Sequence, residues 1–364
     1  MLNEQEKIRY SRHLLLDKIG VEGQEKLKSS KVLVIGAGGL GCPVLQYLSA
    51  AGVGTIGIID FDTVDESNLH RQILFNSEDV GKNKASVAKN KLQKQNQHLS
   101  INSYPEKLTS KNALSLFKNY DVVVDGTDNF STRYLVNDAC VITDKPLVYG
   151  SIYKFEGQVT VFNYLNGPTY RCLFPEPPLI GSIPNCAEVG VLGALPGVIG
   201  TLQATEVIKI ILGIGSVLSG KLLIYNLLTS VLTNLKIKSN PAQIKKTKAL
   251  ETNFSEFNYD VFCGIAQNNS INQSELKELL QKENIQIVDV REEWELPKII
   301  NTNVINAPLN QLEQYISHIS KNKKVVVVCQ KGIRSLHAIK LLSSKYGYKN
   351  LLNLEEGLNN WKNE

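Results

Sequence analysis

Residues 31–62 read KVLVIGAGGLGCPVLQYLSAAGVGTIGIIDFD, and this stretch decides the fold. It predicts a buried strand, a glycine-rich turn, a helix that begins near Gly41 and a second strand that ends at Asp60. The glycines of the turn follow the spacing G-x-G-x-x-G and are Gly36, Gly38, Gly39 and Gly41. A phosphate can approach such a turn closely because no Cβ is in the way, and the helix start directs its unpaired N–H groups at the phosphate.

Asp60 lies about 20 residues beyond the turn, where an acidic side chain binds a ribose hydroxyl in dinucleotide-binding folds. The stretch therefore predicts a bound nucleotide. Taken alone it does not say which nucleotide is bound, or whether the chemistry is hydride transfer or phosphate chemistry, although the motif is commonest in proteins that bind a nicotinamide dinucleotide. The rest of the chain has to decide between the two.

The composition is that of a globular protein with enough material for two domains. The chain has 364 residues, 43% of them hydrophobic and 21% charged, and its net charge of +5 is too small to indicate nucleic acid or a membrane surface as a partner. No C-x-x-C pair occurs among the cysteines, and the N-terminus lacks the apolar core of a secretion signal. We therefore expect free thiols in a reducing compartment and a cytoplasmic protein.

The apolar stretch 189–214 predicts a buried core helix that starts near Pro196. Glu206 and Lys209 fall inside its helical half, and ions at that depth would be costly in lipid. A membrane span is therefore not expected.

A linker-like run of residues in the second half of the chain predicts two domains. Residues 236–250, KIKSNPAQIKKTKAL, contain five lysines, no acid and one proline, as a solvated linker does. Strand–turn–helix patterns precede this run and recur after it, in IQIVDVREEWE and KKVVVVCQKGIRSLHAIKLLSSKYG. We expect a nucleotide-binding domain over 1–238, a linker over 239–269 and a small α/β domain over 270–364.

Three side chains behind the second strand favour a triphosphate over a dinucleotide. Arginine offers a bidentate fork to phosphate oxygens and lysine a mobile point charge, whereas a dehydrogenase has no evident use for either here. The three residues are Asn68, Arg71 and Lys84. Surface charges are the alternative interpretation for each of the two cations.

Asp128 follows the strand predicted over 120–125, at an edge where ligands bind in open α/β sheets. Its carboxylate suits Mg²⁺ held against the phosphates. An N-cap of the following helix explains the same residue equally well, and the spacing leaves both interpretations open.

The motifs of residues 4–238, in chain order, are RYSRHLLL, VLVIGAGGLGCPVLQYLSAAGVGTIGIIDFDTVDESNLHRQ, VGKNKA, DGTDNFSTRYLVNDAC, GSIYKFEGQVTVFN, YRCLFPEPP and NCAEVGVLGALPGVIGTLQATEVIK. Together they resemble the MoeB/ThiF family, the bacterial relatives of ubiquitin-activating enzymes. Further on, VDVREEWE, VVVVCQKGIRS and LEEGLNNW resemble a rhodanese (sulfurtransferase) domain over about 270–362. The resemblance implies a Rossmann-like doubly wound α/β sheet with a second, smaller α/β rhodanese domain.

This resemblance implies an adenylyltransferase that uses ATP and Mg²⁺ to activate the C-terminal glycine of a ubiquitin-like sulfur carrier ending in Gly-Gly. A carboxylate is a poor acceptor, and an acyl adenylate supplies AMP as the leaving group. Gly36, Gly38, Gly39 and Gly41 would form the phosphate turn, Asp60 would hold the ribose, Asn68, Arg71 and Lys84 would bind the triphosphate, and Asp128 would bind Mg²⁺.

Arg12 matches an arginine that family members contribute to the ATP site of a neighbouring subunit. By this resemblance Arg12 would stabilise charge in trans, and a homodimer is the expected working unit. From the residue pattern alone, Arg12 would be a solvated helix charge.

Two cysteines are candidate catalytic residues. Cys329 follows a four-valine strand and precedes a helix start, with Lys331 and Arg334 close by, and all of these favour a thiolate. In the rhodanese family the matching residue carries the transferable sulfur as a persulfide. Cys186 matches a cysteine with which the family engages the activated carrier. Cys42 and Cys140 are expected to be structural.

The chain departs from the family in two places. Family members usually bind a structural zinc through two C-x-x-C pairs, but here Cys172 alone remains of these four ligands, so we expect no zinc. The usual histidine-glycine segment of the rhodanese domain is replaced by LPKIINTNVINAPL, which puts in doubt how well small thiosulfate-like donors are used.

Three interpretations of function remain. The first is adenylation of a molybdopterin-synthase carrier, followed by sulfur delivery from Cys329, which a donor such as a cysteine desulfurase would load. The second is the same chemistry on a thiamine-pathway carrier. The third is a scaffold that binds a ubiquitin-like tail without adenylating it. A dehydrogenase would leave Arg71, Lys84, Asp128 and the second domain without a role.

Overall fold

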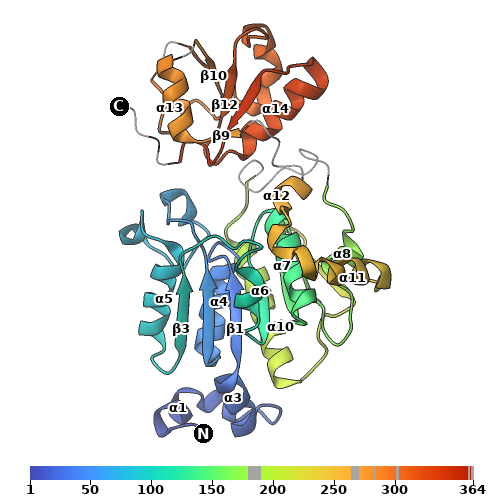
Figure 1. Ribbon diagram of the computed structural model, residues 1–364. Helices are drawn as coiled ribbons and strands as arrows, with labels where there is room; N and C mark the ends of the chain where they lie inside the picture. Colours follow the sequence, from blue (N-terminus) through green and yellow to red (C-terminus); the bar gives the residue numbers. More distant parts are fainter. Residues whose placement is uncertain (179–189, 264–269, 283, 301–302, 360, 362–364) are drawn as a thin grey trace. The chain divides into compact units, whose positions relative to one another are not determined.

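The computed structural model describes residues 1–178, 190–263, 270–282, 284–300, 303–359 and 361. They form two compact units; the first runs to Tyr259 and the second begins at Asp260. Both units are mixed α/β structures with a central sheet (Figure 1). The predicted fold class, a doubly wound sheet with a second and smaller α/β domain, is confirmed.

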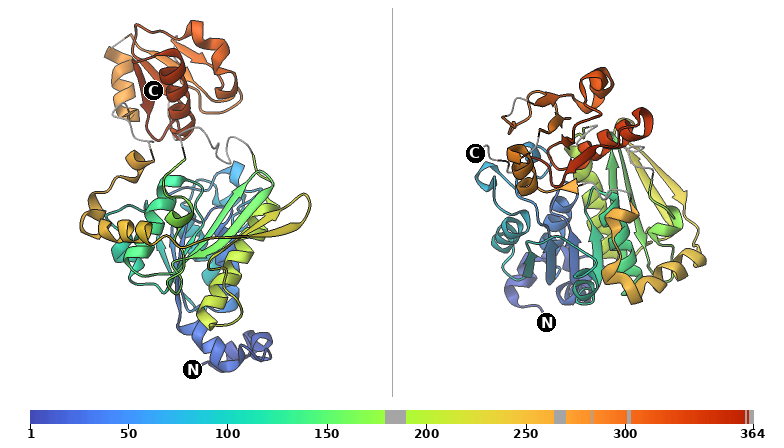
Figure 2. Two further views of the ribbon diagram at one scale, coloured as in Figure 1. Left: turned by 90° about the vertical axis from the view of Figure 1, so that its right-hand side faces the viewer. Right: turned by 45° about the horizontal axis from the view of Figure 1, so that its top comes forward.

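The large sheet has eight strands in the order β3-β2-β1-β4-β5-β6-β7-β8. The first five in this order are parallel, and β6, β7 and β8 continue the sheet in antiparallel pairing (Figure 2). The strands are β1 (Lys31–Ile35), β2 (Thr55–Ile59), β3 (Ser100–Tyr104), β4 (Val122–Asp125), β5 (Leu147–Tyr153), β6 (Glu156–Phe162), β7 (Lys221–Asn226) and β8 (Val231–Lys236).

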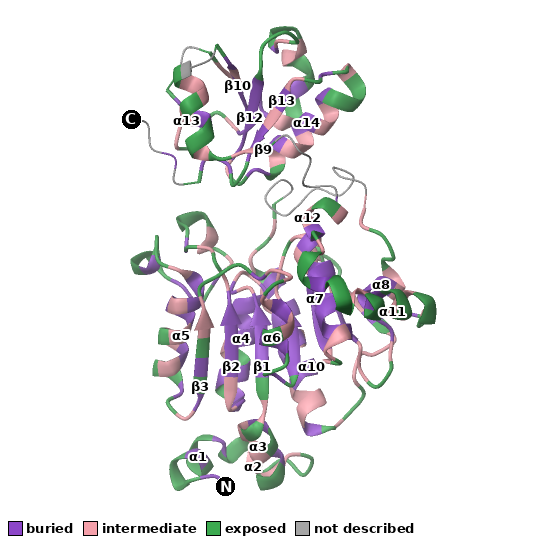
Figure 3. Cartoon of the chain, viewed as in Figure 1, coloured by how far each residue is buried: buried purple, intermediate pink, exposed green. Residues whose placement is uncertain are grey.

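Helices cover both faces of this sheet, as parallel strands require. One face carries α4 (Gly41–Ala51), α5 (Lys84–Gln95) and α10 (Ala194–Leu212), which pack with Val32 and Val34 in one core. The alternate side chain Leu33 is also fully buried. Figure 3 shows β1 in the colour of buried residues over most of its length. Two further helices, α6 (Ala113–Phe117) and α7 (Phe130–Ile142), pack against each other, and α7 contacts β4.

The helix α10 is the buried core helix predicted near Pro196. Its length and apolar composition would suffice to cross a membrane, but half of its apolar window is buried inside the protein. It packs against α4, β5 and β6. Glu206 on this helix accepts the N–H of Leu218 at 2.9 Å, which satisfies its charge within the fold.

Three short helices precede the sheet, namely α1 (Glu4–Arg9), α2 (Ser11–Leu14) and α3 (Gly20–Ser29). They contact the turn between α4 and β2, where the N–H of Gly54 donates to Leu27 at 2.9 Å. A Cβ at Gly54 would lie 1.6 Å from the carbonyl oxygen of Lys28, so this close approach requires glycine. The N-terminal helices therefore lie at the edge of the sheet where the parallel strands begin (Figure 1).

The predicted linker contains ordered elements in its first half. These are α11 (Pro241–Lys248) and the 3₁₀ segment η3 (Ala249–Glu256), which pack against α7. Asn240 caps α11 by accepting the N–H of Ala242 at 3.2 Å. Shorter elements complete this unit: η1 (Glu66–Asn68), η2 (Ser77–Asp79) and α8 (Tyr170–Leu173). The short helix α12 (Tyr259–Phe262) spans the division between the two units. The domain boundaries stay a prediction.

The second unit is built on a parallel sheet of five strands in the order β11-β10-β12-β13-β9. The valines of β12 are all fully buried, as in a central parallel strand. Its elements are β9 (Ser270–Ile271), α13 (Gln273–Lys282), β10 (Gln286–Asp289), β11 (Val304–Asn306), η4 (Leu309–His318), β12 (Val325–Val328), α14 (Ile333–Tyr346) and β13 (Leu351–Leu354).

A buried ion pair joins α7 to α8 in the first unit. Arg171 donates from Nε and Nη2 to the two carboxylate oxygens of Asp138, both at 2.7 Å. The hydroxyl of Tyr259 also donates to Asp138, at 2.9 Å, and Arg171 lies over the ring of Tyr134. Asp138 is thus the common acceptor for α8 and for the last residue of the unit.

Replacing Asp138 by alanine should destabilise the first unit by about 3–5 kcal/mol, because it leaves the Arg171 guanidinium buried without its partner. Urea denaturation of the full chain, with hydrogen exchange of α7 to assign the transition, measures the change. Glu176→Ala breaks the exposed pair with Lys246 and should cost less than about 1 kcal/mol. Equal effects of the two substitutions would contradict this assignment.

Candidate functional site

The strand order places a topological switch point between β1 and β4. The chain leaves β1 toward β2 on one side, and β4 lies on its other side. In open α/β sheets, ligands bind in the crevice beyond the carboxyl ends of the strands at such a point. The residues that follow β1, β2 and β4 therefore form the candidate nucleotide site.

The glycine turn after β1 combines structural glycines with an open one. Gly36 has φ +88°, and a Cβ at Gly41 would lie 2.0 Å from the Gly36 carbonyl oxygen, so both positions require glycine for the fold itself. A Cβ at Gly38 would meet no described protein atom nearer than Nε2 of Gln72, at 3.9 Å. The fold does not need glycine at position 38, which agrees with a ligand that approaches the backbone there.

The helix α4 starts directly after this turn. Its N-cap residue is Leu40, which provides no side-chain hydrogen bond to the first turn. The N–H of Cys42 already donates to the carbonyl oxygen of Gly38 at 2.9 Å, and Pro43 has no N–H, so among the described residues of that turn the N–H of Gly41 is the one left to another acceptor. Gly39 packs against Pro196 of α10, where a Cβ would lie 3.2 Å from the proline Cβ. Pro196 thus packs against one side of the turn, while the N-terminus of α4 stays available for an anion.

Asp60 ties the end of β2 to the glycine turn. Its Oδ2 accepts the N–H of Ala37 and its Oδ1 the N–H of Asp62, both at 2.8 Å. Burial raises the pKa of the Asp60 carboxyl above its ordinary value, and the Lys84 ammonium opposes this rise. Asp60 therefore lies beside the turn, as a ribose-binding residue must.

Lys84 is the first residue of α5 and is almost completely buried. Its Nζ lies 3.2 Å from Oδ2 of Asp62. A buried lysine needs a partner or an anionic ligand, because burial penalises its charge. The structure thus places Lys84, Asp62 and Asp60 at one edge, and the simple surface-charge interpretation of Lys84 is wrong.

Arg71 and Asn68 lie on the segment that follows β2. Nη1 of Arg71 donates to the carbonyl oxygen of Ser67 at 2.9 Å and lies 2.8 Å from Nε2 of His70. A Cβ at Gly39 would be 3.7 Å from Cγ of Arg71, so the stem of the arginine runs beside the turn. Asn68 closes η1 and accepts the N–H of Arg71 at 3.0 Å.

Gln72 is a candidate that the sequence analysis did not identify. Its side chain is buried, and its Oε1 has no hydrogen-bond partner among the described residues. An unsatisfied buried amide oxygen is costly, and here the amide lies near the open space at Gly38. Only its position next to Arg71 could have indicated it.

Asp128 follows β4 and is exposed. The helix α7 is capped by the next residue, since Oδ1 of Asn129 accepts the N–H of Thr132 at 2.9 Å. The N-cap interpretation of Asp128 is therefore wrong. Within the described ranges its carboxylate has no hydrogen bond or ion pair, as suits a ligand for a hard cation such as Mg²⁺.

A buried charge network supports the end of β4. Oδ1 of Asp125 accepts the N–H of Thr127 at 2.8 Å and its hydroxyl at 2.6 Å. Burial raises the pKa of the Asp125 carboxyl, and the neighbouring Arg133 guanidinium opposes the rise. Gln203 of α10 donates to the carbonyl oxygen of Asp125 at 2.7 Å. The strand end that presents Asp128 is therefore anchored from both faces.

The structure does not bring Arg12 together with the other candidates. It is exposed on α2, among the helices at the edge where the parallel strands begin, whereas the turn, Asp60 and Asp128 follow the strand ends. Within one chain Arg12 is at the wrong edge of the sheet. Cys186 lies outside the described residues.

Two cysteines of the first unit are inert by their surroundings. Burial raises the pKa of the Cys42 thiol to about 12, and that of Cys140 rises well above its ordinary value for the same reason. Both are fully buried, which agrees with the structural role that we expected.

Cys172 binds backbone groups in this structure. Its Sγ accepts the N–H of Thr169 at 3.3 Å and that of Asn240 at 3.2 Å. In the described part of the chain no group of three or more His, Cys, Asp or Glu side chains could hold a metal ion. The residues present therefore do not fit a tetrahedral zinc site, while the absence of zinc itself stays a prediction.

The second candidate site surrounds Cys329, which follows β12. Gly332 has φ +77° and turns the chain into α14, so the loop around Cys329 needs glycine there. The thiol is 1% exposed and lies 3.4 Å from Oγ of Ser335, which donates to Oδ1 of Asn353 at 2.6 Å. The sulfur is thus fixed at the N-terminal end of a helix.

Two arginines next to this loop are paired with carboxylates. Arg334 donates to both oxygens of Glu295 at 2.6 Å each. Arg291 is fully buried and pairs with Asp289 at the end of β10, with Nη2 2.8 Å from Oδ2. The pattern VDVREEWE indicated this region, but the partner of Arg334 was not evident from it.

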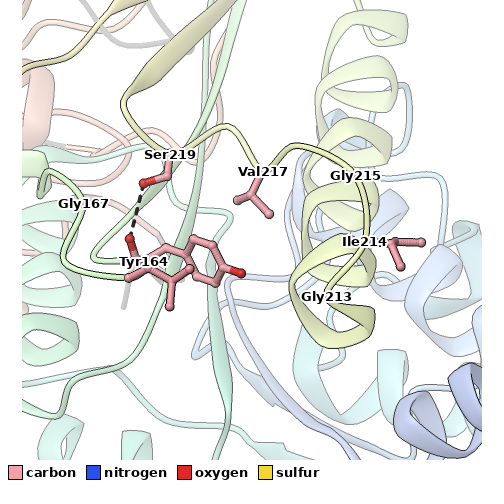
Figure 4. A pocket seen from close by; sticks show the side chains of 8 residues that line it. Tyr164, Gly167, Gly213, Ile214, Gly215, Val217 and Ser219 are labelled. Atoms are coloured by element: carbon pink, nitrogen blue, oxygen red, sulfur yellow. Dashed lines mark hydrogen bonds between the residues drawn. The ribbon is translucent and has the colours of Figure 1, made fainter.

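A surface depression of about 360 Å³ lies elsewhere in the first unit (Figure 4). It is bordered by the end of α10 and by the loop after β6, and Oγ of Ser219 donates to the carbonyl oxygen of Tyr164 across it at 3.5 Å. Its lining has no charged side chain, so it is a poor candidate for phosphate chemistry.

Comparisons with known proteins match both parts of the chain. The ThiF family matches residues 10–285, and the rhodanese-like domain matches residues 272–364. The probable adenylyltransferase/sulfurtransferase MoeZ of Mycobacterium tuberculosis is 41% identical, over 99% of this chain and 94% of its own length. The sulfur carrier protein adenylyltransferase of Thermus thermophilus is 51% identical over 71% of this chain and 96% of its own.

Among solved structures, E. coli MccB with ATP has a TM-score of 0.57 at 26% identity and covers 66% of this chain and 73% of its own. The family match spans more than half of the chain, and the relatives named as adenylyltransferases and sulfurtransferases extend over nearly all of it. This chain therefore belongs to the ThiF family and carries a C-terminal rhodanese-like domain.

Proposed function

We propose that this enzyme adenylates the C-terminal glycine of a ubiquitin-like sulfur carrier ending in Gly-Gly and then transfers sulfur to it from Cys329. The observation that carries the proposal is that one chain contains both a glycine turn with open space at Gly38 and a buried thiol, Cys329, close to the start of a helix. The first fits a nucleotide phosphate and the second a persulfide. Adenylylation and sulfur transfer are also the activities in the names of its relatives.

Each candidate of the first unit has a role in this proposal. The turn at Gly38 and the start of α4 bind phosphate through backbone N–H groups, and Asp60 accepts from the ribose. Lys84, Arg71 and Asn68 bind and neutralise the triphosphate. ATP supplies the adenylyl group, and Mg²⁺, held by Asp128, neutralises the phosphates when bound.

The chemistry then proceeds in two stages. The carrier carboxylate attacks the α-phosphorus and pyrophosphate leaves, which converts a poor acceptor into an acyl adenylate. The terminal sulfur of a Cys329 persulfide attacks the carbonyl carbon and AMP leaves. A thiol, which we assign to Cys186, then cleaves the S–S bond to release the thiocarboxylate and form a disulfide.

We also propose a cytoplasmic homodimer in which Arg12 serves the partner's site. Arg12 lies at the opposite edge of the sheet from its own glycine turn, so it can reach a nucleotide only in a second copy. The N-terminal helices carry uncovered apolar side chains, Ile8 at 76% exposure and Leu15 at 71%, which suits burial against another chain.

The carrier itself is proposed to be of the molybdopterin-synthase small-subunit type, with a thiamine-pathway carrier as the alternative. ATP–pyrophosphate exchange with each purified carrier separates the two. Exchange stimulated by a carrier that ends in Gly-Gly is the expected result. If the intact protein shows no such exchange, the adenylation proposal is contradicted and a non-adenylating scaffold is favoured.

Substitution of Gly38 by alanine should raise the KM for ATP at least about tenfold, because phosphate N–H contacts of roughly 1.5–3 kcal/mol are disturbed. The melting temperature should not change, since the new Cβ meets no described atom within 3.9 Å. Gly41→Ala should instead destabilise the unit by at least about 2 kcal/mol through its clash with Gly36. Steady-state kinetics and thermal melts distinguish the two effects.

Replacing Asp128 by alanine should abolish pyrophosphate exchange and leave stability unchanged, because its carboxylate supports no described contact. Asn129→Ala removes the cap of α7 and should cost about 1 kcal/mol of stability while exchange persists. Loss of stability in the Asp128 variant with exchange retained would overturn the metal role.

Cys329→Ala should leave carrier adenylation intact and stop thiocarboxylate formation, because the sulfur-carrying atom is gone while the ATP site is unaltered. Mass spectrometry of the carrier C-terminus measures this as loss of the 16 Da gain expected when oxygen is replaced by sulfur, roughly one sulfur per carrier. Full thiocarboxylation by the variant would show that sulfur enters by another route.

A further inference from the structure

Arg334 lies at the start of α14, directly after the Cys329 loop (residues 329–332), and its charge is paired with a carboxylate. Nη1 and Nη2 of Arg334 donate to the two oxygens of Glu295 at 2.6 Å each, and the side chains are 18% and 14% exposed. The N–H of Glu292 donates to Glu295 at 2.9 Å and fixes the carboxylate. A bidentate pair of this kind occupies the guanidinium edge that would otherwise bind an oxyanion.

Ionisation of Glu295 keeps this pair closed at neutral pH. Burial alone would raise the pKa of the Glu295 carboxyl, but the hydrogen bonds from Arg334 lower it below its ordinary value. The pKa of Arg334 is raised, by its hydrogen bonds with Glu295 first of all. The two charges are therefore present together and paired.

The second arginine beside the loop is committed in the same way. Arg291 donates from Nε and Nη2 to Asp289, and from Nη1 to Oε1 of Gln330 at 2.9 Å. It therefore holds the loop in place and faces its own carboxylate. Lys331 is exposed, and as a lysine it lacks the bidentate fork of an arginine.

Two exposed apolar side chains lie beside the pair. Trp294 and Leu296 flank Glu295 in the chain and are 80% and 73% exposed. Small sulfur donors such as thiosulfate carry two negative charges and need cations at the thiol. A protein that carries a persulfide instead brings a surface of its own, which apolar side chains can contact.

We propose that Glu295 is a specificity-determining residue. Because it pairs with Arg334, the guanidinium does not bind small dianionic donors, and the Cys329 loop selects a protein-bound persulfide as its sulfur donor. This inference rests on the proposed function, in which Cys329 holds the transferable sulfur. The Cys329 thiolate attacks the terminal sulfur of the donor persulfide, the donor S–S bond breaks, and the donor leaves as a thiolate. With thiosulfate the same attack expels sulfite, and no oxidant or reductant is required.

The test is thiosulfate:cyanide sulfurtransfer by the full-length protein with Glu295→Gln. Because the substitution releases Arg334 to the donor, the KM for thiosulfate should fall roughly tenfold, the size of one charge-assisted hydrogen bond, with kcat little changed. Glu293→Gln removes the same charge from an exposed neighbour and should leave KM unaltered. Adding Arg334→Gln to the Glu295→Gln protein should cancel the gain.

An unchanged KM, or no thiosulfate turnover at all, in a folded Glu295→Gln protein overturns the proposal. Cys329→Ser should abolish turnover in both backgrounds; turnover that survives it refutes the proposed role of Cys329 instead.

A measurement on the unaltered protein covers the case in which the variant does not fold. Iodoacetamide labelling of the Cys329 peptide should be slowed less than twofold by millimolar sulfate, because Arg334 does not bind the anion. Strong protection by sulfate would contradict the assignment of Glu295.

Discussion

The position of β1 between β2 and β4 is the constraint on which both the fold and the candidate nucleotide site depend. The pairing extends past the strand ends, since the N–H of Gly36 donates to Ile59 and the N–H of Gly126 donates to Ile35, both at 2.9 Å. Three chain segments therefore turn away at one level of the sheet. The phosphate turn, the acidic end of β2 and the segment that carries Asp128 lie together because of this register.

Local spacing was enough to predict the residues that this register aligns. The glycine turn and Asp60 lie within one strand–helix–strand unit, where chain geometry fixes their separation, and the burial of Lys84 agrees with a role beyond the surface. Spacing could not choose between Asp128 and Asn129 as the cap of α7. Both side chains can cap a helix, and the sequence does not locate the first residue of a helix to within one position. The hydrogen bond of Asn129 decides that point.

Other features depend on contacts that no sequence window contains. Glu295 and Arg334 are 39 positions apart and meet through the parallel order of β10 and β12. Gln72 is distinguished by the buried oxygen that lacks a partner, which is a property of packing. The placement of Arg12 at the opposite sheet edge follows from how the N-terminal helices contact Gly54, and a motif match alone could not show it.

The two sites treat charge in opposite ways, and their chemistry explains why. In the proposed function a triphosphate carries several negative charges into the crevice, where the start of α4 lacks a side-chain cap and Lys84 and Arg71 supply cations. The proposed persulfide sulfur of Cys329 must remain reactive toward a neutral carbonyl carbon, and paired arginines near its loop do not draw in competing anions. The structure keeps Arg334 and Arg291 in bidentate pairs, whereas the carboxylate of Asp128 is left open. This contrast is what the two proposed reactions on one carrier tail would require.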